Sequence, residues 1–109
     1  MVVWSAPAVQ DLRNIHDYIS RDSEFYADKV IDEFLDNADK LVDFPKMGRV
    51  VPELEDSAVR EIMVYSYRLV YELGEDRIEI NFLLLSYKLV HEVIKVFFRF
   101  IISGVLQIR

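Results

Sequence analysis

The chain has 109 residues, which is enough for one ordinary domain with a single core and too few for two independent cores. Its composition is 52% hydrophobic with three glycines and three prolines, which excludes a disordered or low-complexity chain. The net charge of -6 disfavours direct binding to nucleic acid, because polyanions bind mainly through clustered lysine and arginine side chains.

The sequence contains no cysteine, so a disulfide framework and a thiolate metal site are both excluded. A reducing cytoplasm is therefore the location that we expect. Residues 1–12 lack a basic segment followed by a long apolar run, and we expect no signal peptide. We predict no cofactor and no metal, since GxGxxG, P-loop and HExxH motifs are all absent from the chain.

Residues 1–4 form a short run with strand propensity, and a helix is expected directly after it. Ser5 is a candidate N-cap, and Pro7 falls in the first helical turn, where its missing N–H costs little. Apolar residues then recur at spacings of three and four up to about Ser20, which predicts an amphipathic helix. His16, inside this helix, is expected to lie on its surface or between helices.

A second apolar stripe at helical spacing follows the connection at residues 21–23. Its members are Ala27, Val30, Ile31, Phe34, Leu35, Ala38, Leu41 and Val42. The other face carries Asp28, Asp32, Asp36 and Asp39. We interpret that face as solvated, because a hard-cation site needs oxygens from more than one element. Pro45 is expected to end the helix, and two helices so closely joined should pack as an antiparallel hairpin.

After an irregular connection at residues 45–57, the apolar period changes to two. Runs rich in β-branched and aromatic residues follow at residues 59–65, 67–73 and 77–85. Gly74, Glu75 and Asp76 are a suitable hairpin loop between the last two runs. We predict an α+β fold in which the helical hairpin covers one face of an antiparallel β-sheet, with the N-terminal strand at an edge.

The last part of the chain departs from this pattern. A polar stripe at spacings of four, three, four and four consists of Lys88, Glu92, Lys95, Arg99 and Ser103. If this segment is helical, the rest of its surface is apolar and larger than soluble monomers usually expose. We therefore predict a partner-binding surface at Phe97, Phe98, Phe100 and Ile101, with a homodimer as one possibility. A membrane span is disfavoured, because Lys95 and Arg99 interrupt the run.

Cationic and phenolic side chains gather in the connection and in the first two long strands. The candidates for a catalytic site are Arg49, Arg60, Tyr67 and Arg68. Scission of RNA without a metal needs a base, an acid and cations that neutralise the phosphorane, and these groups can supply them. Ordinary ion pairs of Arg60 and Arg68 with Glu53 or Glu61 are the preferred alternative. Tyrosines are also common strand residues, where they usually pack rather than react.

A series of short sequence pieces runs through about residues 1–80. The pieces are Trp4-Ser5, Ala8, Asp11-Leu12, Ile15, Tyr18-Ile19, Ala27, Leu41, Phe44-Pro45, Gly48-Arg49, Val51-Pro52-Glu53, Arg60-Glu61 and Tyr67-Arg68-Leu69-Val70-Tyr71. In this order and spacing they resemble the ParE branch of the RelE/ParE toxin superfamily, also called plasmid stabilisation proteins. The resemblance implies a single toxin domain over residues 1–109, with a helical hairpin packed on an antiparallel sheet.

The resemblance further implies the toxin of a type II toxin–antitoxin system, bound by a small antitoxin of the ParD or RelB type. ParE-like members block bacterial DNA gyrase, whereas RelE-like members cut messenger RNA in the ribosome. The ParE pattern is the closer one here, and the acidic charge agrees, because a ribosomal nuclease is expected to be basic. Inhibition of gyrase by protein binding is the first hypothesis. A RelE-like ribosome-dependent endoribonuclease and a nontoxic dimerising module are the alternatives.

The chain departs from the family pattern after Ile80. Relatives usually continue to a His-Gly-x-Arg type motif, whereas residues 81–88 here read NFLLLSYK. His91 and Arg99 do not have the spacing of that motif, so no role is transferred to them. Because the C-terminal region matters for toxicity in the family, we expect a weak or inactive toxin.

Overall fold

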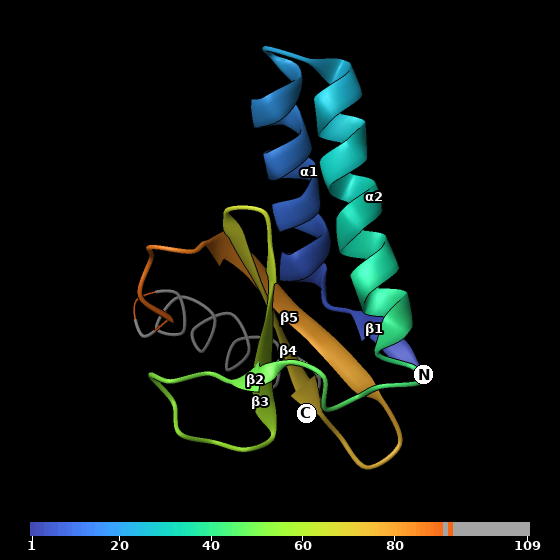
Figure 1. The fold of residues 1–109 in the computed structure, drawn as a ribbon, viewed down its shortest axis with the longest axis vertical. Coiled ribbons are helices and arrows are strands. Elements are labelled where there is room, and N and C mark those ends of the chain that lie inside the picture. The colour runs from blue at the N-terminus through green and yellow to red at the C-terminus, as the bar shows by residue number, and fades with distance from the viewer. Residues whose placement is uncertain (91, 93–109) are drawn as a thin grey trace, which may run out of the picture.

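The computed structural model describes residues 1–90 and residue 92 and has an α+β architecture (Figure 1). Its elements in chain order are β1 (Val2–Trp4), α1 (Ala6–Ser20), α2 (Glu24–Lys40), β2 (Arg49–Val50), β3 (Val59–Val64), β4 (Tyr67–Leu73) and β5 (Ile78–Leu85). The strands form one sheet in the order β1-β5-β4-β3-β2. The helices form an antiparallel hairpin whose buried side chains pack on one face of this sheet. The predicted fold class is confirmed.

The sheet is mixed rather than purely antiparallel. β1 runs parallel to β5, with Val2 opposite Ile78, whereas β3, β4 and β5 pair antiparallel as predicted. The chain between β1 and β5 contains the helical hairpin, and a parallel pair requires such a long crossover. β2 is a two-residue strand inside the connection that we expected to be irregular, and it pairs with Arg60 and Glu61 of β3.

Both helices begin at a serine cap, of which the sequence analysis named Ser5. The Ser5 hydroxyl accepts a hydrogen bond from the Ala8 N–H at 3.1 Å, and Ser23 caps α2 in the same way. The second helix ends at Lys40, four residues before the expected stop next to Pro45. The N–H of Leu41 bonds to the Ala38 carbonyl three residues back, so the last turn tightens before the proline is reached.

The main core lies between the hairpin and the sheet. Its buried residues are Ala8, Ile15, Val30, Phe34, Ala38, Leu41, Val64, Leu69, Tyr71, Ile78, Ile80 and Leu83. The rings of Phe34 and Tyr67 meet edge to face with centroids 5.8 Å apart. The buried side chains of the helices recur every three or four residues and those of the strands every two. Each set therefore lies on one face of its layer, and the two faces pack together.

A second apolar cluster lies on the opposite face of the sheet. It consists of Val51, Val59, Val70, Phe82, Leu84 and Val90, with no residue from α1 or α2. β4 and β5 are therefore buried on both faces, which explains the nearly continuous apolar run in β5.

Asn81 is an extra residue in β5. Val70 pairs with Phe82 and Tyr71 pairs with Ile80, so Asn81 has no partner on β4 and forms a β-bulge. The Ser5 hydroxyl donates a hydrogen bond of 2.8 Å to the Asn81 carbonyl. Asn81 Oδ1 is buried without a hydrogen-bond partner in the part of the chain that the structure describes.

The expected partner-binding residues Phe97, Phe98, Phe100 and Ile101 lie outside the described residues, as does His91. Their role in binding a partner stays a prediction. Within residues 1–90, no helix is both long and apolar enough to cross a membrane.

Tyr71 fastens the loop before β2 to the sheet. Its hydroxyl accepts a hydrogen bond from the Gly48 N–H at 3.0 Å and donates one to the Pro45 carbonyl at 2.9 Å. A Cβ atom on Gly48 would lie 2.6 Å from the Glu61 carbonyl oxygen and 2.7 Å from the Tyr71 hydroxyl. Only glycine therefore allows the loop to approach this closely.

We expect Tyr71→Phe to lower the free energy of unfolding by about 1–3 kcal/mol, because a buried N–H and a carbonyl both lose a partner. Tyr87→Phe is the control, since the side chain of Tyr87 is 75% exposed. Urea denaturation of both variants measures the difference. A Tyr71→Phe midpoint equal to that of Tyr87→Phe would contradict this role of the hydroxyl.

Candidate functional site

Four charged side chains form an ionic cluster on the sheet face opposite the hairpin: Arg49, Glu53, Glu61 and Arg68. Arg68 is 5% exposed, and its Nε donates to Glu61 Oε1 at 2.7 Å. Its two terminal nitrogens donate to the Glu53 carboxylate, each at 2.8 Å. Glu61 also accepts a hydrogen bond from Arg49 Nε at 2.7 Å. Two guanidinium groups and two carboxylates thus neutralise one another.

The ionic cluster also holds the chain that follows β5. Arg68 Nη1 donates to the Lys88 carbonyl at 3.0 Å, and Glu53 Oε2 accepts from the Val90 N–H at 3.1 Å. The hydrogen bonds from Arg68 are the main reason that the pKa of Glu53 is lowered to about 2. Glu53 is therefore ionised under all ordinary conditions, and the loop after β2 is joined to the start of the C-terminal segment.

The candidate catalytic residues lie on two faces of the sheet. Arg49 and Arg68 belong to the ionic cluster, whereas Arg60 and Tyr67 lie on the face that carries the hairpin. Arg60 Nη1 donates to the Gly48 carbonyl at 2.9 Å and forms no ion pair among the described residues. The ion-pair interpretation is therefore confirmed for Arg68 and wrong for Arg60. A catalytic role for any of the four stays a prediction.

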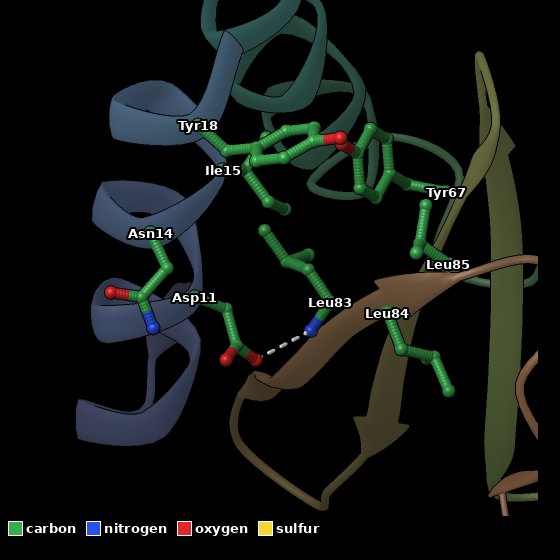
Figure 2. A pocket seen from close by; sticks show the side chains of 8 residues that line it. All are labelled: Asp11, Asn14, Ile15, Tyr18, Tyr67, Leu83, Leu84 and Leu85. Carbon is green, nitrogen blue, oxygen red and sulfur yellow. Dashed lines mark hydrogen bonds between the residues drawn. The ribbon is translucent and has the colours of Figure 1, made fainter. Parts of the chain in front are cut away.

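A hollow of about 330 Å³ lies between α1 and β5 (Figure 2). Its lining residues are Asp11, Asn14, Ile15, Tyr18, Tyr67, Leu83, Leu84 and Leu85. Asn14, Ile15 and Tyr18 follow Asp11 by three, four and seven positions, so the four residues from α1 share one face of the helix. The hollow therefore combines an aliphatic floor with a rim of carboxylate, amide and phenol groups.

Asp11 joins the first helix to the last strand. Its carboxylate accepts a hydrogen bond from the Leu83 N–H at 2.9 Å, at the part of β5 that extends beyond its pairing with β1 (Figure 2). Burial raises the pKa of Asp11, and the Leu83 hydrogen bond opposes that rise. Asp11 was not among the expected site residues. The one signal for it was its place in the Asp11-Leu12 piece of the family resemblance.

Aromatic rings border one end of the hollow. The rings of Tyr18 and Tyr67 lie with their hydroxyl ends toward each other (Figure 2). Burial is the main cause of the raised pKa of Tyr67, with smaller contributions from Tyr18 and Tyr26. The ring of Tyr26 in turn contacts that of Tyr65 at the β3–β4 turn, with centroids 6.0 Å apart. Exposed phenols beside apolar side chains are typical of surfaces that bind other proteins.

Glu72 and Glu79 are direct cross-strand partners on β4 and β5. Like charges in this arrangement are destabilising. The pKa of Glu72 is raised, mainly by burial and further by the carboxylates of Glu79 and Asp56. These acids do not form a metal site, and no group of three or more histidine or acidic side chains among residues 1–90 could hold a metal ion.

Glu79→Lys should therefore raise the free energy of unfolding by about 0.5 kcal/mol, because a repulsive pair becomes attractive. Glu75→Lys makes the same change of charge in the exposed β4–β5 loop and is the control. Thermal denaturation at pH 7 compares the two variants. If Glu79→Lys is no more stable than the control, repulsion between the two carboxylates is not significant.

The fold and the site define a class of protein. It is a small α+β domain in which a helical hairpin packs on one face of a five-stranded sheet and an ionic cluster lies on the other face. A family model described as the ParE toxin of the type II toxin–antitoxin system parDE matches residues 2–85, which include every helix and strand of the described fold. The chain belongs to this family.

The fold is also similar to that of a solved structure, described as the chromosomal ParDE toxin–antitoxin system from P. aeruginosa. The two chains are 20% identical, with a TM-score of 0.64, and the match covers 77% of this chain and 92% of the other. At this identity the similarity shows a common fold. No curated protein sequence matches the chain.

Proposed function

We propose that this member of the ParE toxin family acts by binding and inhibiting DNA gyrase, and that a cognate antitoxin of the ParD or RelB type neutralises it. Membership of a family described by the parDE toxin–antitoxin system supports the antitoxin as a partner. The ParE-like sequence pieces and the acidic charge support gyrase rather than the ribosome as the target.

The hydrogen bonds and the burial of Arg68 favour a function in protein binding over RNA cleavage. A cation that stabilises a phosphorane must present free N–H groups to the phosphate. In this chain the Arg68 guanidinium donates to two carboxylates and one backbone carbonyl and is 5% exposed. Release of Arg68 would leave Glu53 without a cationic partner and the buried Glu61 with Arg49 alone, so the present role of Arg68 is structural.

The hollow beside α1 supports a binding function. It places aliphatic side chains next to phenol and carboxylate groups, and protein interfaces commonly combine an apolar centre with a polar rim. Tyr18 at its border is largely exposed and can bury its ring while its hydroxyl keeps a polar contact. This surface is available to a protein without any change in the ionic cluster.

A supercoiling assay with purified gyrase and the purified full chain tests the proposal. We expect the chain to inhibit supercoiling and the antitoxin to restore it. Cleavage of translated messages without any effect on gyrase would favour the RelE-like endoribonuclease. Absence of both activities, together with a dimer in light scattering, would favour the nontoxic dimerising module.

We also propose that the toxin is weak, because the sequence after Ile80 contains no His-Gly-x-Arg type motif. Expression in a bacterial host without antitoxin should slow growth only slightly. Strong growth arrest would contradict the weak activity while leaving the inhibition of gyrase open to the supercoiling assay.

A further inference from the structure

The hollow beside α1 contains a carboxylate without a cationic partner. Asp11 accepts the hydrogen bond from the Leu83 N–H at 2.9 Å, and it forms no ion pair in the part of the chain that the structure describes. Burial raises the pKa of Asp11, because its negative charge loses water without gaining a cation. Glu53 and Glu61, on the opposite face of the sheet, are both paired with Arg68. A cation brought to Asp11 would therefore be bound favourably.

The floor of this hollow is aliphatic and the space above it is small. Ile15, Leu83, Leu84 and Leu85 provide the apolar lining (Figure 2). The volume of about 330 Å³ is close to the lower limit of ordinary ligand pockets, which is roughly 300 Å³. The hollow therefore fits one long side chain of a partner better than a large ligand.

The groups around the hollow match the parts of an arginine side chain. The methylene stem of arginine packs on apolar surface while its charged end keeps polar contacts. Its planar guanidinium donates to a carboxylate in a fixed geometry and is also attracted to the faces of aromatic rings. Asp11 supplies the carboxylate, and Tyr18 and Tyr67 supply aromatic rings and phenol oxygens at one end of the hollow (Figure 2).

The hairpin that borders the hollow carries most of the negative charge of the chain. Residues 6–40 contain nine acidic and four basic side chains, and the net charge of the whole chain is -6. A surface of this sign attracts a basic partner. An enzyme that acts on DNA carries clustered arginine and lysine side chains where it contacts the phosphates. DNA gyrase, the proposed target, therefore has surfaces of complementary charge.

We propose that the hollow beside α1 binds an arginine side chain on the surface of DNA gyrase. The guanidinium donates to the Asp11 carboxylate, the methylene groups contact Ile15 and Leu83, and the rings of Tyr18 and Tyr67 cover the remaining side. Asp11 is thus a residue that determines which partner binds. This inference rests on the proposed function, which provides gyrase as the target.

Asp11→Asn tests the contribution of the charge. Asparagine keeps an oxygen that accepts from the Leu83 N–H but has no negative charge. Asp17→Asn makes the same change of charge at an exposed position of α1 outside the hollow and is the control. Calorimetric titration of purified gyrase with the full chain should give a dissociation constant about tenfold higher for Asp11→Asn and less than about twofold higher for the control. Higher ionic strength should weaken binding of the parent chain more than that of Asp11→Asn.

Tyr18→Ala tests the aromatic border without disturbing the core, since Tyr18 is 67% exposed. It should raise the same dissociation constant about fivefold, whereas Phe25→Ala should leave it unchanged. Phe25 is 77% exposed and does not line the hollow. Equal effects within either pair of variants, in a chain that does bind gyrase, would overturn the inference and leave the proposed function intact. Absence of binding by the parent chain would overturn the proposed function with it.

Discussion

Replacement of Arg68 by methionine should lower the free energy of unfolding by about 3–5 kcal/mol. Arg68 is the common partner of Glu53 and Glu61, and the Glu61 side chain is fully buried. Without the guanidinium, both carboxylates remain on a largely dehydrated face and repel each other. A loss of this size is a large part of the 5–15 kcal/mol, roughly, that stabilises an ordinary domain.

Arg49→Met is the matched control for this experiment. Arg49 contacts the same carboxylate, Glu61, but its side chain is 64% exposed, so the loss should be at most about 1 kcal/mol. Guanidinium chloride denaturation of the two variants provides the comparison. Similar losses in both would show that burial of the ionic cluster does not determine its contribution to stability.

The second large effect is a loss of stability in acid. The pKa of Glu53 is about 2 in the folded chain, below its usual value of 4.5. A carboxylate with a lowered pKa stabilises the fold above its unfolded pKa, and that stabilisation is lost as the pH falls from about 4.5 to about 2. Because the Glu53 side chain is 17% exposed, the loss should be on the order of 2–3 kcal/mol.

Glu53→Gln isolates this contribution. The variant should be less stable than the parent chain at pH 7, and its stability should fall less steeply between pH 4.5 and 2. Asp11 and Glu72 have the opposite effect on the pH dependence of stability. Their pKa values are raised in the folded chain, and a carboxyl with a raised pKa stabilises the fold at low pH. Parallel profiles of free energy against pH for the variant and the parent would show that Glu53 is not the group responsible.

The structure gives a physical meaning to the longest piece of the family resemblance, Tyr67-Arg68-Leu69-Val70-Tyr71. The piece is β4, the strand between β3 and β5, and alternate residues point to opposite faces. Leu69 and Tyr71 enter the main core, while Arg68 and Val70 enter the ionic cluster and the second apolar cluster. Its tyrosines and arginine therefore fit a structural explanation without any catalytic role.

The sequence by itself was sufficient for the helices and the long strands, because these depend on local signals. Ser5 caps the first helix as predicted, apolar residues repeat at helical spacing, and the change to a period of two predicts the sheet. The hairpin loop was predicted at residues 74–76 and lies at residues 74–77, since Gly74 and its neighbours favour a turn between the two strands.

Only the tertiary structure decided which charged side chains meet. Asp11 contacts Leu83 across 72 positions of the chain, and Arg68 selects Glu53 and Glu61 while Arg60 turns to backbone carbonyls. The parallel pairing of β1 and the short β2, which leaves half of β3 open, have the same origin. The periodicity of a helix or strand predicts the face on which a side chain lies. The partner of that side chain depends on contacts between distant segments, which no local spacing encodes.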